Sequence, residues 1–171
     1  GDFVGNTVDV ETEILTAGGA AIRNYETAGN VIGNFVDNGA SAPEGLAFGG
    51  AILNLSNNIT HAVVTDGTNT VLGNIEGNFI GNTVEDSELV AGGAVLNATN
   101  VAETDVSIGD ITGDFVANYA LTNGTALGGA IANIVDSTME TATTSISTIT
   151  GDFIDNNVEG DVNAFGGAVY N

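Results

Sequence analysis

Hydrophobic and polar residues alternate along short stretches of this chain that are interrupted by glycine. In the stretch VLGNIEGNF (71–79), the residues Val71, Ile75 and Phe79 share one parity with two intervening glycines. The pentapeptide ITGDF repeats this order at 111–115 and again at 149–153. A period of two residues is typical of a β-strand whose alternate residues lie on one face. Apolar residues at helical spacing are not sustained anywhere, so we expect strands and no substantial helix.

Two short motifs each occur five times and alternate strictly along the chain. The first reads Gly-(Asp/Asn)-Phe-(Val/Ile)-x-Asn and begins at residues 1, 33, 77, 113 and 151. The second is Gly-Gly-Ala, which begins at residues 18, 49, 92, 128 and 166. In four of its copies an asparagine follows three residues after the alanine, whereas the first copy, GGAAIRN, has one additional residue before Asn24.

The spacing of the closing asparagines favours a stacked array. The step from the phenylalanine motif to Gly-Gly-Ala is 15 to 18 residues, and the return step varies from 14 to 28 residues. Length variation in one connection is expected when insertions bulge from one side of a solenoid. Hairpins of a sandwich or a barrel would also give regular strands. A parallel solenoid fits better, because it stacks like residues on each other about 4.8 Å apart.

We therefore predict an all-β fold, a parallel β-helix or solenoid of about ten coils in five two-coil repeats, which we expect to be right-handed. One domain spans 1–171, with units at approximately 1–32, 33–76, 77–112, 113–150 and 151–171, and the rod would be about 50 Å long. One internal stripe, interleaved by the alanines of alternate coils, would contain Phe3, Phe35, Phe79, Phe115 and Phe153. Side-chain amides stacked at bends would form an internal ladder. Its members would be Asn6, Asn38, Asn54, Asn82, Asn97, Asn118, Asn133, Asn156 and Asn171.

The charge balance excludes some classes of partner. The chain has 22 acidic residues against Arg23 alone, which gives a formal net charge of −21. Such a chain cannot neutralise phosphates, so nucleic acids and anionic membrane surfaces are excluded as partners. No run approaches 18 apolar residues, so we expect no membrane insertion of this segment. The absence of cysteine excludes disulfides and thiolate metal sites.

The alternation of Phe-x-x-Asn with Gly-Gly-Ala-(Ile/Val/Leu) resembles the repeat pair of chlamydial polymorphic outer-membrane proteins and related autotransporter adhesins. The resemblance extends from FVGN at Phe3 to GGAVYN at Asn171. In that family such repeats form the β-helical passenger outside the cell, with roles in adhesion and self-association. The resemblance implies an extracellular location on a bacterial cell surface. The implied partners are further copies of the chain and host or bacterial surface receptors or glycans.

Few residues suggest chemistry. His61 is the sole histidine, so we interpret it as an ordinary loop residue, and for Arg23 we expect a structural or surface ion-pair role. Asp and Asn interchange at the second position of the phenylalanine motif, which indicates a turn or outward polar position rather than a general acid. Carbohydrate-cleaving β-helices act on polyanions with cationic side chains that this chain lacks. We therefore expect no enzyme activity and no cofactor.

Calcium is the one metal that the pattern suggests. Acidic residues follow three copies of the phenylalanine motif at corresponding places, and carboxylates stacked on an exposed edge could bind Ca²⁺ weakly. Ordinary solvated surface acids are the favoured interpretation. The candidate ligands are Asp9, Glu11, Glu85, Asp86, Glu159 and Asp161.

The sequence thus predicts an extracellular, surface-displayed rod that mediates adhesion or self-association. The alternative is a subunit of a filament that polymerises head to tail, since neither terminal motif is followed or preceded by a polar capping segment. A carbohydrate-active β-helix is the least favoured hypothesis. Because the chain begins on one motif and ends on the other, we expect it to be a segment of a longer protein or fibre.

Overall fold

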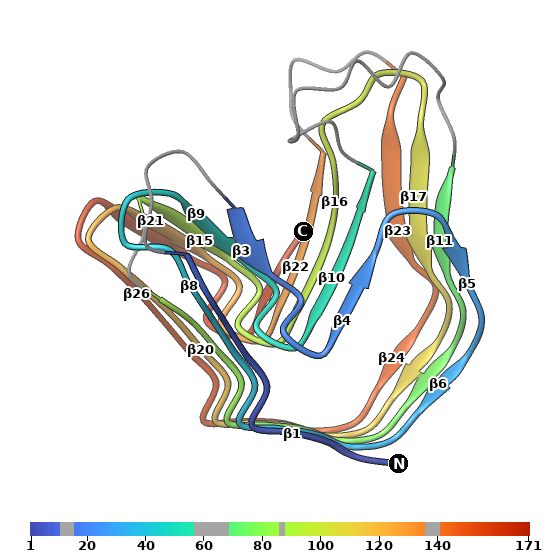
Figure 1. Ribbon diagram of the computed structural model, residues 1–171, viewed down its shortest axis with the longest axis horizontal. Helices are drawn as coiled ribbons and strands as arrows, with labels where there is room; N and C mark the ends of the chain where they lie inside the picture. The colour runs from blue at the N-terminus through green and yellow to red at the C-terminus, as the bar shows by residue number, and fades with distance from the viewer. Residues whose placement is uncertain (11–15, 57–68, 86–87, 136–140) are drawn as a thin grey trace.

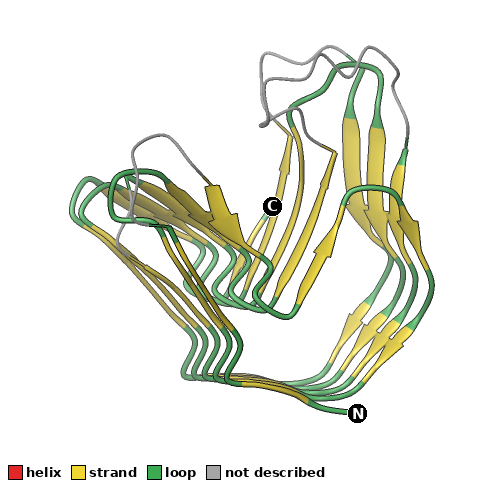
Figure 2. Cartoon of the chain, viewed as in Figure 1, coloured by secondary structure: helices red, strands yellow, loops and turns green. Residues whose placement is uncertain are grey.

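The computed structural model describes residues 1–10, 16–56, 69–85, 88–135 and 141–171, and every regular element in these ranges is a β-strand. Figure 2 shows short strands joined by bends throughout. The strands are short because glycine and asparagine, which favour bends, interrupt the apolar alternation every few residues.

The strands fall into five successive groups. The first group is β1 (Phe3–Val4), β2 (Thr7–Asp9), β3 (Thr16–Gly18), β4 (Ile22–Asn24), β5 (Thr27–Ala28) and β6 (Val31–Ile32). The second is β7 (Phe35–Val36), β8 (Gly39–Ser41), β9 (Leu46–Phe48), β10 (Ile52–Ser56), β11 (Thr70–Leu72) and β12 (Ile75–Glu76). The third is β13 (Phe79–Ile80), β14 (Thr83–Glu85), β15 (Leu89–Ala91), β16 (Val95–Thr99), β17 (Asp105–Ile108) and β18 (Ile111–Thr112). The fourth is β19 (Phe115–Val116), β20 (Tyr119–Thr122), β21 (Thr125–Leu127), β22 (Ile131–Val135), β23 (Thr143–Ile146) and β24 (Ile149–Thr150). The fifth is β25 (Phe153–Ile154), β26 (Asn157–Gly160), β27 (Asn163–Phe165) and β28 (Val169–Tyr170).

Each strand pairs in parallel with the strand six positions away, so six strands make one coil. Six sheets result, which we name after their first strands: the β1, β2, β3 and β4 sheets have five strands each, and the β5 and β6 sheets have four. The register places like on like: Phe79 pairs with Phe35 on one side and with Phe115 on the other. The predicted parallel β-helix is confirmed, and Figure 1 shows its coils one behind another.

The predicted number of coils is wrong. Both motifs of a repeat unit lie in the same coil, on the β1 sheet and at the start of the β4 sheet, so the described strands form five coils rather than ten. The stack is therefore roughly 19 Å from the first coil to the last, not 50 Å. The physical reason is the cross-section: a coil that encloses two interiors needs the residues of both motifs.

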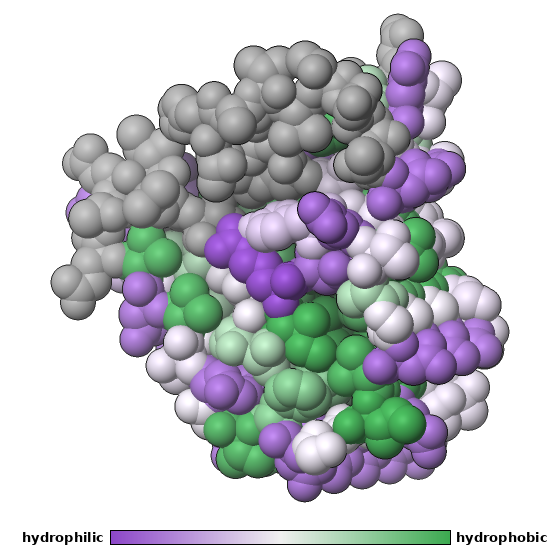
Figure 3. All heavy atoms as spheres, turned by 45° about the vertical axis from the view of Figure 1, so that its right-hand side comes forward, coloured by the Kyte–Doolittle hydropathy of each residue, from purple (hydrophilic) through white to green (hydrophobic). Residues whose placement is uncertain are grey.

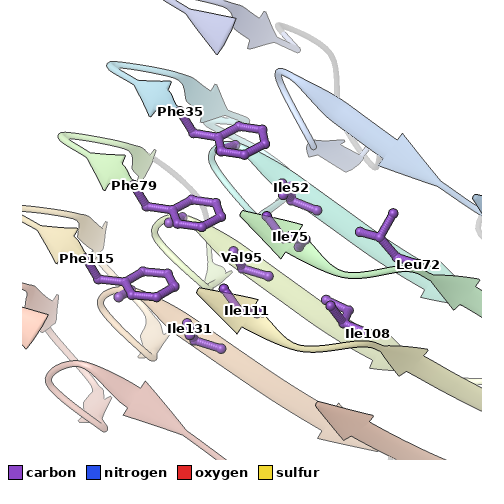
Figure 4. Packing of buried hydrophobic residues seen from close by; sticks show 13 residues of the cluster. Phe35, Ile52, Leu72, Ile75, Phe79, Val95, Ile108, Ile111, Phe115 and Ile131 are labelled. Carbon is purple, nitrogen blue, oxygen red and sulfur yellow. The ribbon is translucent and has the colours of Figure 1, made fainter. Parts of the chain in front are cut away.

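The six sheets enclose two interiors, which give the coil two lobes. In Figure 1 these lobes appear as two arms that diverge above the β1 sheet. The β1, β4, β5 and β6 sheets surround the broad lobe, and the β2 and β3 sheets face each other in the narrow lobe. The broad lobe is filled by Phe35, Ile52, Leu72, Ile75, Phe79, Val95, Ile108, Ile111, Phe115 and Ile131, with Ala51, Ala94 and Ala130 (Figure 4). The narrow lobe is filled by Ala17, Ala40, Ala42, Ala47, Val84, Val90, Ala120 and Ala126.

The five phenylalanines of the first motif form one continuous column in the broad lobe. Adjacent ring centroids lie 4.7 to 4.8 Å apart, and the ring planes differ by only 1 to 4°. Each ring therefore stacks directly on the next one, and the predicted interleaved alanines do not lie between them. The rings of the three middle coils are fully buried, which stabilises each coil by about 2 to 3 kcal/mol per ring.

The second glycine of Gly-Gly-Ala allows the two lobes to meet. A Cβ atom on Gly50 would lie 2.2 Å from the carbonyl oxygen of Gly93 and 2.4 Å from that of Thr83, both on the next coil. Only glycine fits such a close approach between backbones. The pairing of Gly18 with Phe48 also shows that the first Gly-Gly-Ala copy was aligned wrongly. It has no additional residue, because Ala20 takes the place of Gly50 and Asn24 pairs with Asn54.

Candidate functional site

The first asparagine ladder is internal and fully hydrogen-bonded. In each coil the amide of this asparagine contacts the coil on either side. Asn82 Nδ2 donates to Asn118 Oδ1 at 2.8 Å and to the carbonyl oxygen of Phe35 at 3.0 Å. Its Oδ1 accepts from the backbone N–H and the side-chain amide of Asn38, at 3.1 and 2.9 Å. A buried amide with all these partners stabilises the corner between the β1 and β2 sheets. The ladder contains Asn6, Asn38, Asn82, Asn118 and Asn156.

The second ladder lies on the β4 sheet and ties it to the β5 sheet. Asn54 Nδ2 donates to Asn97 Oδ1 at 2.7 Å and to the carbonyl oxygen of Ser107 at 3.0 Å. Asn24 belongs to this ladder, since its Nδ2 donates to Asn54 Oδ1 at 2.7 Å. Sequence reasoning left Asn24 out because the first Gly-Gly-Ala copy was misaligned. The ladder contains Asn24, Asn54, Asn97, Asn133 and Asn171.

The Asp/Asn position of the phenylalanine motif forms an outer polar column. The side-chain oxygen of each member accepts a hydrogen bond from the backbone N–H of the next member, at 2.9 to 3.0 Å. Carboxylate and amide oxygens both serve as acceptors, which explains why Asp and Asn interchange here. The column contains Asp2, Asn34, Asn78, Asp114 and Asp152, and this role is structural rather than catalytic.

The candidate calcium ligands are not gathered by the described strands. Asp9, Glu85 and Glu159 share one column of the β2 sheet, but Ser41 and Leu121 separate them. Their coils are thus about 10 Å apart. Asp161 is exposed in the turn after β26, while Glu11 and Asp86 lie outside the described residues. Within the described ranges, no group of three or more His, Cys, Asp or Glu side chains is placed to hold a metal ion. Calcium binding stays a prediction.

One of these carboxylates has a defined partner. The hydroxyl of Tyr119 donates to Glu159 Oε2 at 2.5 Å. This hydrogen bond, together with partial burial and the negative charge of Glu159, raises the pKa of Tyr119 above 10.0, because the neutral phenol is the form that donates. The pair clamps the fourth coil to the fifth on the outer face of the β2 sheet.

Two further residues from the sequence have simple outcomes. Arg23 contacts an aromatic ring: its guanidinium carbon lies 5.0 Å from the ring centroid of Tyr25, and its Nε donates to the Tyr25 hydroxyl. This is a cation–π contact in place of the expected ion pair. His61 lies outside the described residues.

The feature that sequence reasoning missed is an apolar groove between the lobes. The outer face of the β3 sheet and the outer face of the β4 sheet diverge from the waist and enclose a cavity of about 430 Å³. We call this cavity the apolar groove. Its lining is Leu46, Phe48, Leu55, Leu89, Ala91, Leu96, Ala98, Thr99, Asn100, Leu127 and Ile134.

The walls of the groove are apolar because their strands are apolar on both faces. In β10, Ile52 points into the broad lobe, whereas Leu53 and Leu55 belong to the cluster at the groove. In β15, Val90 packs in the narrow lobe and Ala91 faces the groove. The signal was present in the sequence, since stretches such as ILNL and VLNA have apolar residues at both parities. A strand with one wet face would alternate with polar residues instead.

No helix in the described ranges is long and apolar enough to cross a membrane. The chain matches no protein-family model, no curated protein and no solved structure.

Proposed function

We propose that this chain is an extracellular structural and adhesive β-solenoid, displayed on a bacterial cell surface, that mediates adhesion or self-association. The observation that carries the proposal is the apolar groove. Contiguous apolar surface on an otherwise strongly charged protein marks sites of interaction. The resemblance of the two motifs to autotransporter adhesin repeats supports the same role.

The rest of the fold suits a rod that presents such a surface. Stacked phenylalanines and two asparagine ladders fix each coil on its neighbours, so residues on the outer faces form columns at strand spacing. The net charge of −21 keeps the remaining surface soluble.

The proposal is tested by displaying the chain on a non-adherent bacterium. Attachment to cultured epithelial cells and clumping of the bacteria are both measured. The matched control is the same display with Phe79→Ala and Phe115→Ala, which removes two buried rings while the net charge stays unchanged. We expect attachment or clumping only with the folded chain. Equal values for both displays would reject an adhesive role.

A second candidate is a subunit of a head-to-tail filament. In both ladders every amide donates toward the C-terminal coil, so the stack is polar along its axis. The first and last coils carry the same motif. A copy stacked in continuation would therefore place Phe3 on Phe153 and Asn6 on Asn156 in the register found within the chain. Figure 3 shows hydrophobic residues at the surface on one side of the molecule.

Electron microscopy of the purified protein separates the two candidates. Long fibres of uniform width support polymerisation, and dispersed short particles at high protein concentration reject it.

A further inference from the structure

The apolar groove contains a socket that one coil creates. On the third coil both walls carry alanine, Ala91 from β15 and Ala98 from β16. In the same register, the coils on either side carry larger residues: Phe48 and Leu127 flank Ala91, and Leu55 and Ile134 flank Ala98. The two small side chains therefore open a space that the neighbouring coils close above and below.

The interior of the socket has little polar chemistry to offer. Thr99 is buried, and its Oγ1 is already paired with Thr104 Oγ1 at 2.8 Å and with the carbonyl oxygen of Val101 at 3.3 Å. Asn100, where the β4-sheet wall ends, is exposed. A group that enters the socket gains by burying apolar surface, and a polar group would lose its hydrogen bonds to water there. The volume of about 430 Å³ falls within the range of pockets that hold ligands.

The ends of the wall strands carry negative charge. Glu44 and Glu88 lie in the turns before β9 and β15, and Glu103 lies in the turn after β16; all three are exposed. The only Arg or Lys of the chain, Arg23, is held against Tyr25 in the first coil. With a net charge of −21 the protein attracts cations and repels anions, so a fatty acid or an anionic lipid is disfavoured.

We propose that the apolar groove binds a peptide segment of a partner protein in which apolar side chains are flanked by Lys or Arg. The apolar side chains fill the socket at Ala91 and Ala98, and the cationic side chains face the carboxylates of the rim. This inference rests on the proposed adhesive function and names the chemistry of its partner.

The probe is a synthetic peptide with a Leu-Phe-Leu core between two pairs of lysines. Two matched peptides replace all four lysines with glutamine or with glutamate. Binding is measured by calorimetry, and the site is located from the methyl NMR signals of Ala91 and Ala98. We expect the lysine peptide to bind and to shift both methyl signals. The glutamine peptide should bind at least about tenfold more weakly, and the glutamate peptide should not bind.

Filling the socket provides the decisive variant. Ala98→Leu places in the third coil the side chain that Leu55 already carries in the second coil, in the same register, so the fold should be retained. Val116→Leu, on the outer face of the β1 sheet away from the groove, is the control. We expect Ala98→Leu to weaken binding of the lysine peptide by about tenfold or more and Val116→Leu to leave it unchanged. Circular dichroism checks that both variants fold.

Three results would overturn the inference. One is the absence of lysine-peptide binding to the unmodified chain. Another is equal binding to the unmodified chain and to Ala98→Leu, which would indicate non-specific attraction to an acidic surface. The third is equal binding of the lysine and glutamine peptides, which would indicate an apolar site without selection by charge. If the peptide fails while the displayed chain still adheres to cells, the groove inference is wrong and the adhesive function stands.

Discussion

The two lobes are built from the same coils but are filled in opposite ways. The broad lobe contains a column of phenylalanines with isoleucine, leucine and valine around it, whereas the narrow lobe contains only alanine and valine. The broad lobe is surrounded by four sheets, and the narrow lobe by two sheets that face each other closely. The comparison teaches that the same stacking rule supports two kinds of core: one is sensitive to loss of volume, the other to gain of volume.

The largest effect is expected from emptying the broad lobe. Phe79→Ala removes a fully buried ring that stacks on Phe35 and Phe115. The unfolding free energy should fall by about 3 to 5 kcal/mol. Urea denaturation followed by circular dichroism measures the change. A loss below about 1 kcal/mol would show that the column does not hold the lobe together.

The next largest effect concerns the polar boundary of the broad lobe. Asn82→Ala leaves the amide of Asn38, the carbonyl oxygen of Phe35 and Asn118 Oδ1 without their partner. Since an unsatisfied buried group costs about 1 to 3 kcal/mol, we expect a loss of about 2 to 4 kcal/mol. Asn78→Asp in the outer polar column is the matched control and should change stability by less than about 0.5 kcal/mol, because the carboxylate accepts the same bond. If both variants lost equal stability, burial of the first ladder would not matter.

A smaller effect with the opposite change of volume is expected in the narrow lobe. Ala126→Leu adds three carbons to a fully buried site between two close sheets. Overpacking should cost about 1 to 3 kcal/mol. The same substitution at Ala98, in the apolar groove, should cost less, so the difference between the two melting curves is the measurement. A neutral Ala126→Leu would mean that the narrow lobe has spare room.

The smallest effect is a titration on the outer face of the narrow lobe. The hydrogen bond to Glu159 raises the pKa of Tyr119 above 10.0 in the folded chain. The resulting stabilisation is present below pH 10 and is lost as the pH rises through the pKa of the folded state. NMR titration of the Tyr119 ring should show its pKa moving down toward 10 in Glu159→Gln. An unchanged pKa would mean that the pair does not form in solution.

Some of this architecture could be predicted from the sequence. The parity of residues such as Ile75 and Phe79, and their recurrence in phase, was enough for parallel strands with like residues stacked. The number of coils was not, because a spacing of about 15 residues fits a small coil of its own. Only the pairing of Phe79 directly with Phe35 shows that a full repeat unit makes one turn.

The groove was missed for a related reason. Its lining residues, such as Leu55 and Leu96, have the parity of solvent-facing positions in their strands. Their apolar character becomes meaningful only when a coil is known to bend into two lobes whose outer faces meet. The bend depends on backbone contacts such as that of Gly50 with Thr83, which no local pattern encodes.

The central claim is that each two-motif unit forms one coil, because the pairing that creates the groove follows from it. The chain has no cysteine, so disulfide formation can test this directly. Val36 and Ile80 pair in register on the outer face of adjacent coils, whereas Val36 and Val116 are two coils apart. Disulfides need a Cα separation of about 4.4 to 6.8 Å, and strand spacing gives about 4.8 Å for the first pair and about 10 Å for the second. After mild oxidation of the monomer, mass spectrometry should find the bond in V36C/I80C and not in V36C/V116C. A bond in the second variant, or none in the first, would contradict the five-coil stack.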